Sequence, residues 1–239
     1  MGRGALLLTV LLVLATFPAQ EASGKKLRLK NKEVALIEFD FSLDEDVRRK
    51  MVPYEELFPS LPSSVSEGDP VFFLLKAYTY QTFQRQAERS LSLLLMPLNA
   101  YGKQWEYDQY GFPATNIELA QRRGSSKIYV RLKVEVLRSP ESGLSLGAGP
   151  AVETHLKPKD YLRPRVKINA TFYPKLGVVP IAVYESDFQW ENPVLLQPTM
   201  LDGLVNSRLR RDRASLREIL DTGVSSIIEE IARGKSKKL

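Results

Sequence analysis

The sequence predicts an α+β fold: a mixed sheet of about five strands, a long crossover helix, and a carboxyl-terminal helix packed on one face of the sheet. Three observations support this class. Apolar and polar residues alternate along Lys127–Val136, which is the period of a half-buried strand. A second alternating segment, Arg165–Tyr173, is followed by a turn and a return strand, as in a hairpin. Near the carboxyl end, apolar residues recur at helical spacing.

The first strand is expected at Val34–Phe39, a short apolar run that ends at a charged residue. Asp44–Asp46 follows and suits the first turn of a short helix, because acidic side chains are favoured at the positive end of a helix. Leu91–Met96 is predicted as the second buried strand, and it leads into a loop rich in aromatic residues.

Asp69–Pro70 predicts the start of the long helix. An acidic cap followed by proline at the first helical position is a typical amino-terminal signal. The helix is expected to run to about Arg89. Because the opening Val71–Leu75 is almost entirely apolar, a strand at this position is the competing interpretation.

The carboxyl-terminal half begins with a loop near 138–163, rich in Gly, Ser and Pro, which we expect to be mobile. The hairpin after it uses Pro174–Gly177 as its turn and Val178–Tyr184 as its return strand. Pro180 lies within that return strand and indicates a sheet edge or a bulge, because proline has no N–H to donate to a ladder.

The terminal helix is expected to begin after Asp212, with Ser215 and Glu218 at capping-box spacing as an alternative start. A basic tail, 233–239, follows the helix. The apolar stripe that should pack on the sheet consists of Leu216, Ile219, Leu220, Val224, Ile227, Ile228 and Ile231.

The first residues have the layout of a secretory signal peptide: a basic residue, Arg3, the apolar run Ala5–Ala15, and then a stretch of small residues. The apolar run of about 11 residues is shorter than the roughly 20 that span a bilayer, which argues against an uncleaved anchor. We expect a signal peptide at 1–24 and a single domain at 25–239. Cleavage after Ala19, Ala22 or Gly24 is compatible with the sequence, and Gly24 fits best.

The chain contains no cysteine. Disulfides, thiolate metal sites, a cysteine nucleophile and a lipid-bearing cysteine are therefore excluded. Secreted eukaryotic domains usually carry disulfides, so an exported chain without them is more typical of the bacterial periplasm. The net charge of +6 is compatible with anionic lipid, an anionic polymer or an acidic protein as partner.

The order of elements, from VALIEF through the long helix and KIYVRLKVEV to the hairpin RVKINATFY and VVPIAVY, resembles a known domain. It is similar to the α/β domain of the TolB amino-terminal region and of the curli-secretion lipoprotein family of the bacterial envelope, over most of residues 32–232. The resemblance implies a small envelope domain that binds other proteins. The chain lacks the family's lipid-bearing cysteine and any extra pair of amphipathic strands, so pore formation is not implied.

Catalytic and metal-binding constellations are not evident. The single histidine, His155, lies in the predicted mobile loop beside Lys157, without an orienting carboxylate. Asp44–Asp46 and Glu229–Glu230 are the carboxylate clusters, and neither has the spacing of a calcium loop. We therefore expect no catalytic residue, no metal ligand and no cofactor, although paired carboxylates far apart in the chain would escape this test.

The first candidate site is the aromatic loop Leu98–Pro113. Either it is a binding loop, or its large side chains form a small core of their own. We favour the second interpretation, because aromatic residues in compact loops commonly pack on their own domain. The residues that a binding loop would use are Tyr101, Trp105, Tyr107, Asp108 and Tyr110.

The second candidate site is a basic sheet face that the two alternating strands would share with Tyr129. It would suit an anionic polymer or lipid headgroups, but an ordinary solvated face has the same composition and is the interpretation we favour. Nucleic acid is not expected as a partner of an exported protein, and the basic tail alone predicts only weak contact with a membrane surface. The residues of this predicted face are Lys127, Arg131, Lys133, Arg165 and Lys167.

The sequence thus favours a non-enzymatic exported envelope protein that binds other envelope proteins. Two alternatives remain open: a binder of anionic glycan or lipid that uses the basic face, and a hydrolase that uses dispersed carboxylates. The sequence does not indicate an oligomeric state or a specific ligand.

Overall fold

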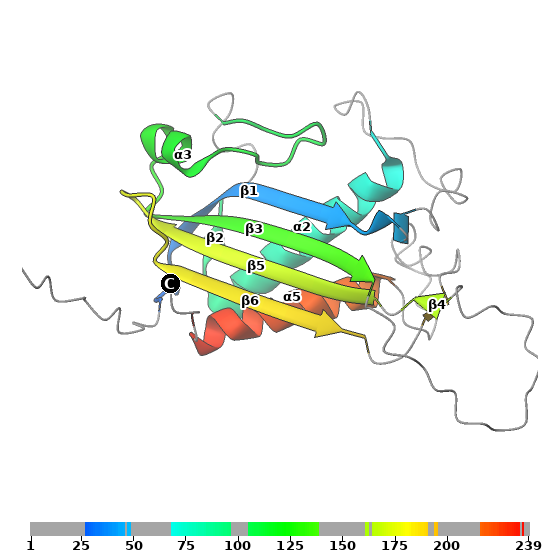
Figure 1. Ribbon diagram of the computed structural model, residues 1–239. Coiled ribbons are helices and arrows are strands. Elements are labelled where there is room, and N and C mark those ends of the chain that lie inside the picture. Colours follow the sequence, from blue (N-terminus) through cyan, green and yellow to red (C-terminus); the bar gives the residue numbers. More distant parts are fainter. Residues whose placement is uncertain are drawn as a thin grey trace, which may run out of the picture.

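Five strands form one mixed sheet in the order β2–β1–β3–β5–β6 (Figure 1). β1 runs parallel to β2 and to β3, whereas β5 and β6 continue the sheet as antiparallel neighbours. The α+β class predicted from the sequence is confirmed. The strands are β1 (Glu33–Leu43), β2 (Leu94–Leu95), β3 (Ile128–Arg138), β5 (Pro164–Pro174) and β6 (Ala182–Gln189), and a separate two-stranded pair consists of β4 (Tyr161–Leu162) and β7 (Val194–Leu195).

The computed structural model describes residues 27–45, 47–48, 68–96, 105–138, 161–162, 164–190, 194–195, 216–234 and 236. The predicted signal peptide, Tyr101, His155 and nearly all of the predicted mobile loop lie outside these residues, as does most of the basic tail.

Three helices accompany the sheet: α2 (Pro70–Leu91), α3 (Ile117–Arg123) and α5 (Leu216–Arg233). α2 connects the parallel strands β1 and β2, so it is the predicted crossover helix. α2 and α5 contact each other and cover the same face of the sheet (Figure 1). α3 was not predicted from the sequence; it begins after Asn116, whose side chain accepts a hydrogen bond from the Leu119 N–H.

The start of α2 matches the sequence signal. Asp69 Oδ1 accepts hydrogen bonds from the N–H groups of Val71 and Phe72 at 2.8 and 3.1 Å, and Pro70 is the first helical residue. This cap satisfies two N–H groups that have no partner within the helix. The alternative strand at Val71–Leu75 is therefore wrong. The helix also continues through Leu91, which leaves β2 shorter than predicted.

α5 is held by its apolar stripe, because all seven predicted positions are buried. Full burial of an aliphatic side chain contributes about 1.5–3 kcal/mol, which outweighs the marginal stability of an isolated helix. Gly223 lets the helix approach the sheet closely. A Cβ atom there would lie 2.8 Å from Val166 Cγ1, too close for any other residue without a shift.

The return strand of the hairpin begins later than the sequence predicted. β6 starts at Ala182, and residues 175–181 form the turn. Gly177 has a φ of +95°, a conformation that favours glycine. Pro180 lies in this turn and so is outside the ladder, where its missing N–H costs nothing. The apolar residues before Ala182 consequently point into solvent.

Tyr80 on α2 makes a testable contribution to the core. Its ring packs against Phe39 and Phe112, with 5.7 Å between centroids in each pair, and the residue is 4% exposed. Its hydroxyl is buried and has no hydrogen-bond partner among the described residues. Burial raises the pKa of Tyr80 to about 12.

We expect Tyr80→Phe to raise the free energy of unfolding at pH 7 by about 1 kcal/mol, because it removes a buried polar group without hydrogen bonds. Above pH 10 the unfolded tyrosine ionises while the folded one does not, so wild-type stability falls as the pH rises towards 12. The free energy of unfolding, measured in urea at pH 7 and at pH 11, should fall less between these pH values for Tyr80→Phe than for the wild type.

Tyr78→Phe on the same helix is the matched control. The Tyr78 hydroxyl donates to Asp221 Oδ1 at 2.6 Å and accepts from Arg217 Nε at 2.9 Å. Its removal should lower stability by about 1 kcal/mol or more, because charged partners are left behind. Equal destabilisation by both substitutions would show that the Tyr80 hydroxyl has a partner after all.

Candidate functional site

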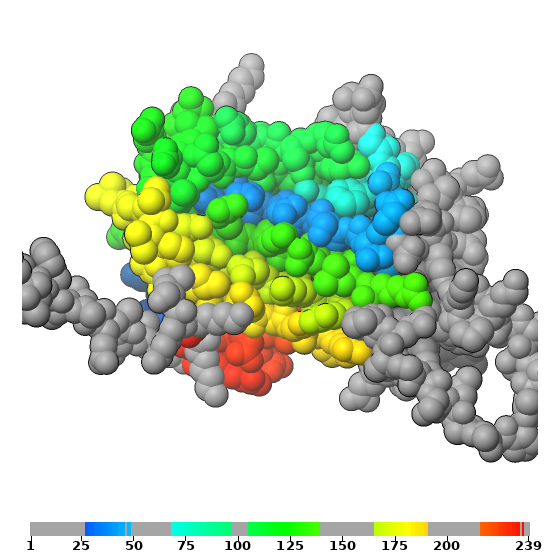
Figure 2. Space-filling view, viewed as in Figure 1, coloured from blue at the N-terminus to red at the C-terminus, as the bar shows by residue number. Residues whose placement is uncertain are grey.

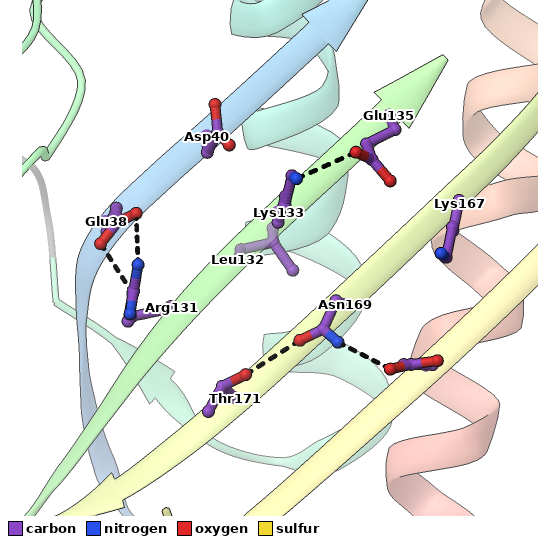
Figure 3. A pocket seen from close by; sticks show the side chains of 10 residues that line it. Glu38, Asp40, Arg131, Leu132, Lys133, Glu135, Lys167, Asn169 and Thr171 are labelled. Carbon is purple, nitrogen blue, oxygen red and sulfur yellow. Dashed lines mark hydrogen bonds and ion pairs between the residues drawn. The ribbon is translucent and has the colours of Figure 1, made fainter. Parts of the chain in front are cut away.

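The strands turn every second side chain to the face opposite α2 and α5 (Figure 2). In the described part of the chain no helix lies over the middle of this face, and α3 covers only one end. A shallow groove with a volume of about 440 Å³ runs across it (Figure 3). The groove is lined by Glu38, Asp40, Arg131, Leu132, Lys133, Glu135, Lys167, Asn169, Thr171 and Glu185.

The strand register places unlike charges beside each other on this groove face. Residues that pair across neighbouring strands form a row on this face, and the side chains of paired residues interact directly. No row carries two like charges on adjacent strands. The rows are Glu38–Arg131–Thr171, Asp40–Lys133–Asn169–Glu185, and Glu135–Lys167–Asp187.

Arg131 and Glu38 form a two-point ion pair between β3 and β1. Arg131 Nε lies 2.6 Å from Glu38 Oε2, and Nη2 donates to Oε1 at 2.7 Å. The hydrogen bond that Arg131 donates to Glu38 raises the pKa of Arg131. Both side chains are partly exposed, so the pair contributes little to stability, but its fork geometry fixes the orientation of both groups.

The remaining polar side chains are similarly arranged. Lys133 Nζ lies 2.9 Å from Glu135 Oε1, and this contact raises the pKa of Lys133. Arg165 binds both carboxylate oxygens of Asp187, and these hydrogen bonds lower the pKa of Asp187. Within β5, Thr171 Oγ1 donates to Asn169 Oδ1 at 2.9 Å, and Asn169 Nδ2 donates to Glu185 Oε1 of β6 at 3.1 Å.

The predicted basic face is therefore a face of mixed charge. Arg131, Lys133 and Lys167 line the groove, Arg165 lies beyond it, and Lys127 precedes β3. Tyr129 points to the same side but is fully buried. The acidic residues of the face other than Glu38 were missed because β1 and β6 extend further than predicted: the predicted strands ended at Phe39 and at Tyr184, whereas β1 continues to Leu43 and β6 to Gln189. The acidic residues are Glu38 and Asp40 of β1 and Glu185 and Asp187 of β6.

The aromatic loop folds against β1. The Phe39 N–H donates to the Pro113 carbonyl and the Thr115 N–H donates to the Ile37 carbonyl, each at 2.9 Å. These bonds continue along β1 beyond the short strand β2. Trp105 is 5% exposed and packs in a second apolar cluster, on the α3 side of the sheet, with Ala35, Ile37, Ala120, Tyr129 and Tyr173.

Asp108 organises this loop. Its Oδ1 accepts hydrogen bonds from the N–H groups of Tyr110 and Phe112, both at 2.9 Å. Its Oδ2 binds the ammonium of Lys76, a residue of α2 that is only 4% exposed. Lys76 Nζ also lies 5.3 Å from the ring centroid of Phe112 and 5.6 Å from that of Phe39, within the range of cation–π contacts. Lys76 could not be singled out from the sequence, because a lysine in a predicted helix is usually exposed to solvent.

Tyr110 completes the contact with α2. Its ring lies 5.2 Å from that of Phe72 and 6.2 Å from that of Phe73, and its hydroxyl accepts a hydrogen bond from the Asp69 N–H at 3.2 Å. Tyr107 is half-buried, and its backbone pairs with Pro113. These contacts agree with a loop that forms its own core, and they leave the groove face as the better candidate site.

Metal-binding geometry is absent from the described residues. They contain no group of three or more His, Asp or Glu side chains able to hold a metal ion. Glu229 and Glu230 are both paired with Arg233, at 2.9 and 2.8 Å. Among the helices described, none is long and apolar enough to cross a bilayer.

The buried position of Trp105 predicts that Trp105→Ala lowers the free energy of unfolding by about 3–5 kcal/mol. On a Trp190→Phe background, where only Trp105 emits, acrylamide should quench the folded protein weakly. Urea-unfolded protein is the control and should be quenched strongly. Strong quenching of the folded protein, with an unchanged melting temperature for Trp105→Ala, would instead indicate an exposed binding loop.

No protein-family model matches the chain, and no curated protein matches it. Nine solved chains match by structure. A hypothetical protein of Chlamydia trachomatis is 13% identical with a TM-score of 0.40, over 85% of this chain and 94% of that one. A homolog of a neuraminyllactose-binding hemagglutinin from Helicobacter pylori is 10% identical with a TM-score of 0.35, over 89% of this chain and 91% of that one.

Proposed function

We propose that this chain is a non-catalytic binding protein of the bacterial cell envelope, exported by an amino-terminal signal peptide, and that its groove face binds another protein. The observation that carries the proposal is the groove of alternating charge on the face opposite α2 and α5. The element order, which resembles that of envelope domains that bind proteins, is in keeping with this role.

A protein partner suits the groove better than a polyanion. Its lining contains four acidic and three basic side chains, so a uniformly anionic glycan or lipid surface would meet repulsion as well as attraction. A protein surface can offer charges of both signs in a matching order. Asp40 and Lys167 line the groove and form no ion pair within the part of the chain that the structure describes, although Asp40 helps to raise the pKa of Lys133 and Lys167 helps to lower that of Asp187. Their charges can therefore meet charges of a partner.

The groove is a poor site for a hydrolase reaction catalysed by carboxylate side chains. A general acid needs apolar surroundings that keep its proton at neutral pH. Glu38 and Glu135 are held by Arg131 and Lys133 instead, and Glu185 accepts a hydrogen bond from Asn169. Each of these carboxylates therefore lies among polar or charged partners rather than in apolar surroundings.

Site-specific photo-crosslinking in the native host tests the proposal. A benzoylphenylalanine at Thr171 or Asp40 lies in the groove, and one at Gln81 on the exposed side of α2 is the matched control. We expect the groove positions to crosslink to the same envelope protein and the control not to do so. Lys167→Glu should weaken that crosslink about tenfold, because it reverses one of the groove charges. The proposal would be contradicted if benzoylphenylalanine at Gln81 gave the same crosslinked product as the groove positions, or if the groove positions gave no crosslinked product.

The same cell fractions test export. Mass spectrometry of the envelope-associated protein should give an amino terminus between Gln20 and Lys25. An intact Met1 on the protein would show that the segment is retained.

A further inference from the structure

All the large apolar side chains that the described part of the chain leaves exposed lie at one end of the sheet, where β1, β2 and β3 begin. Four of them are on the turn between β5 and β6. The exposed fractions are 78% for Leu176, 50% for Val178, 71% for Val179, 44% for Ile181 and 58% for Leu94 at the start of β2. Leu94 lies on β2, at the opposite edge of the sheet from β6, so the cluster consists of the four residues on the turn. A contiguous group of exposed apolar side chains commonly marks an interaction site.

Hydrogen bonds hold the turn between β5 and β6 in a defined conformation. Gln121 of α3 donates from Nε2 to the carbonyls of Pro174 and Gly177, at 2.9 and 2.8 Å. The Ile181 N–H donates to the Phe172 carbonyl at 2.8 Å, which closes the hairpin. These bonds fix the backbone on both sides of the apolar tip, so the tip (Leu176, Val178, Val179 and Ile181) is presented outward rather than folded back. In Figure 1 the turn and α3 lie next to each other at this end.

Basic residues are frequent in the segments at this end of the sheet. Lys175 begins the turn, and Lys127 precedes the residue that pairs with Pro174. Arg122 and Arg123 follow Gln121 directly, at the end of α3. Segments 27–33, 117–127 and 175–181 together contain seven basic residues and two acidic ones, Glu33 and Glu118. The basic ones are Arg28, Lys30, Lys32, Arg122, Arg123, Lys127 and Lys175.

We propose that this end of the domain docks on an anionic lipid bilayer. The apolar tip enters the interface between headgroups, and the basic residues at this end contact lipid phosphates. An exposed tip of aliphatic side chains needs no matching pocket in a fluid interface, and anionic headgroups complement the basic charge. A groove or flat patch would have favoured a protein partner, but these apolar side chains lie on the turn of a hairpin, between β5 and β6.

The two surfaces are distinct. The strands run away from the tip, so a domain docked by this end keeps its groove face at the side, accessible to a partner. The inference therefore goes beyond the proposed function, and each surface can be altered without the other.

Vesicle co-sedimentation tests the docking. We expect the protein to bind vesicles of phosphatidylglycerol and phosphatidylcholine, to bind pure phosphatidylcholine much less, and to lose binding as salt rises. Leu176→Asp with Val179→Asp should lower the partition coefficient at least about tenfold, since it removes apolar surface and adds charge repelled by the lipid. Arg122→Glu with Lys175→Glu should lower it similarly. Lys133→Glu with Lys167→Glu on the groove face changes the net charge by the same amount, so it is the charge-matched control and should leave the partition coefficient within about twofold.

Insertion of the tip itself has a separate readout. The cysteine-free chain permits a single Val179→Cys variant that carries an environment-sensitive fluorophore, with Lys133→Cys as control. Emission should shift to the blue on anionic vesicles only for the tip label.

The proposal fails if the wild type does not bind anionic vesicles, if the tip variants bind them as the wild type does, or if the emission of the tip label does not shift. It also fails if light scattering shows a dimer that the tip substitutions dissociate, because a second copy would then cover the tip. Loss of groove crosslinks with vesicle binding retained would refute the proposed function alone.

Discussion

The ion pair between Lys76 of α2 and Asp108 of the aromatic loop is the contact on which the arrangement of the domain depends. An ammonium buried among phenylalanine rings is costly unless a carboxylate is close, so α2 can pack on β1 in this way only with the loop in place. Asp108 also fixes the loop through the N–H groups of Tyr110 and Phe112. One side chain thus couples the local turn to the main core.

This coupling decides which surfaces are left for binding. The loop hydrogen-bonds to β1 where the two-residue strand β2 ends, and so occupies part of the edge of the sheet. Trp105, Tyr110 and Phe112 pack inward, so the described part of the loop offers little for a ligand. What remains exposed is the groove face, with its alternating charges, and the apolar tip between β5 and β6. The two surfaces have different chemistry, and we assign them to a protein and to lipid respectively.

The sequence predicted those elements whose patterns are local. The cap at Asp69 and the stripe on α5 follow from periodicity and hydrogen-bonding chemistry within a few residues. The groove could not be predicted, because Glu38 meets Arg131 only through a strand order that hydrophobic patterns do not specify. The start of β6 was misplaced for a related reason: Val178 and Val179 look like strand residues, but Gln121, 53 residues before Pro174 and 56 before Gly177, holds them in a turn.

A double-mutant cycle across the central ion pair tests this account most directly. Lys76→Met keeps the length of the side chain, and Asp108→Asn keeps an acceptor for the two loop N–H groups. Asp108→Asn leaves the buried Lys76 ammonium without a carboxylate, and we predict that it lowers the free energy of unfolding by about 3 kcal/mol. The double variant should recover part of this loss, with a coupling energy of about 1–3 kcal/mol. A near-neutral Asp108→Asn with no coupling, measured by urea unfolding, would show that the loop and α2 are held together by apolar packing alone.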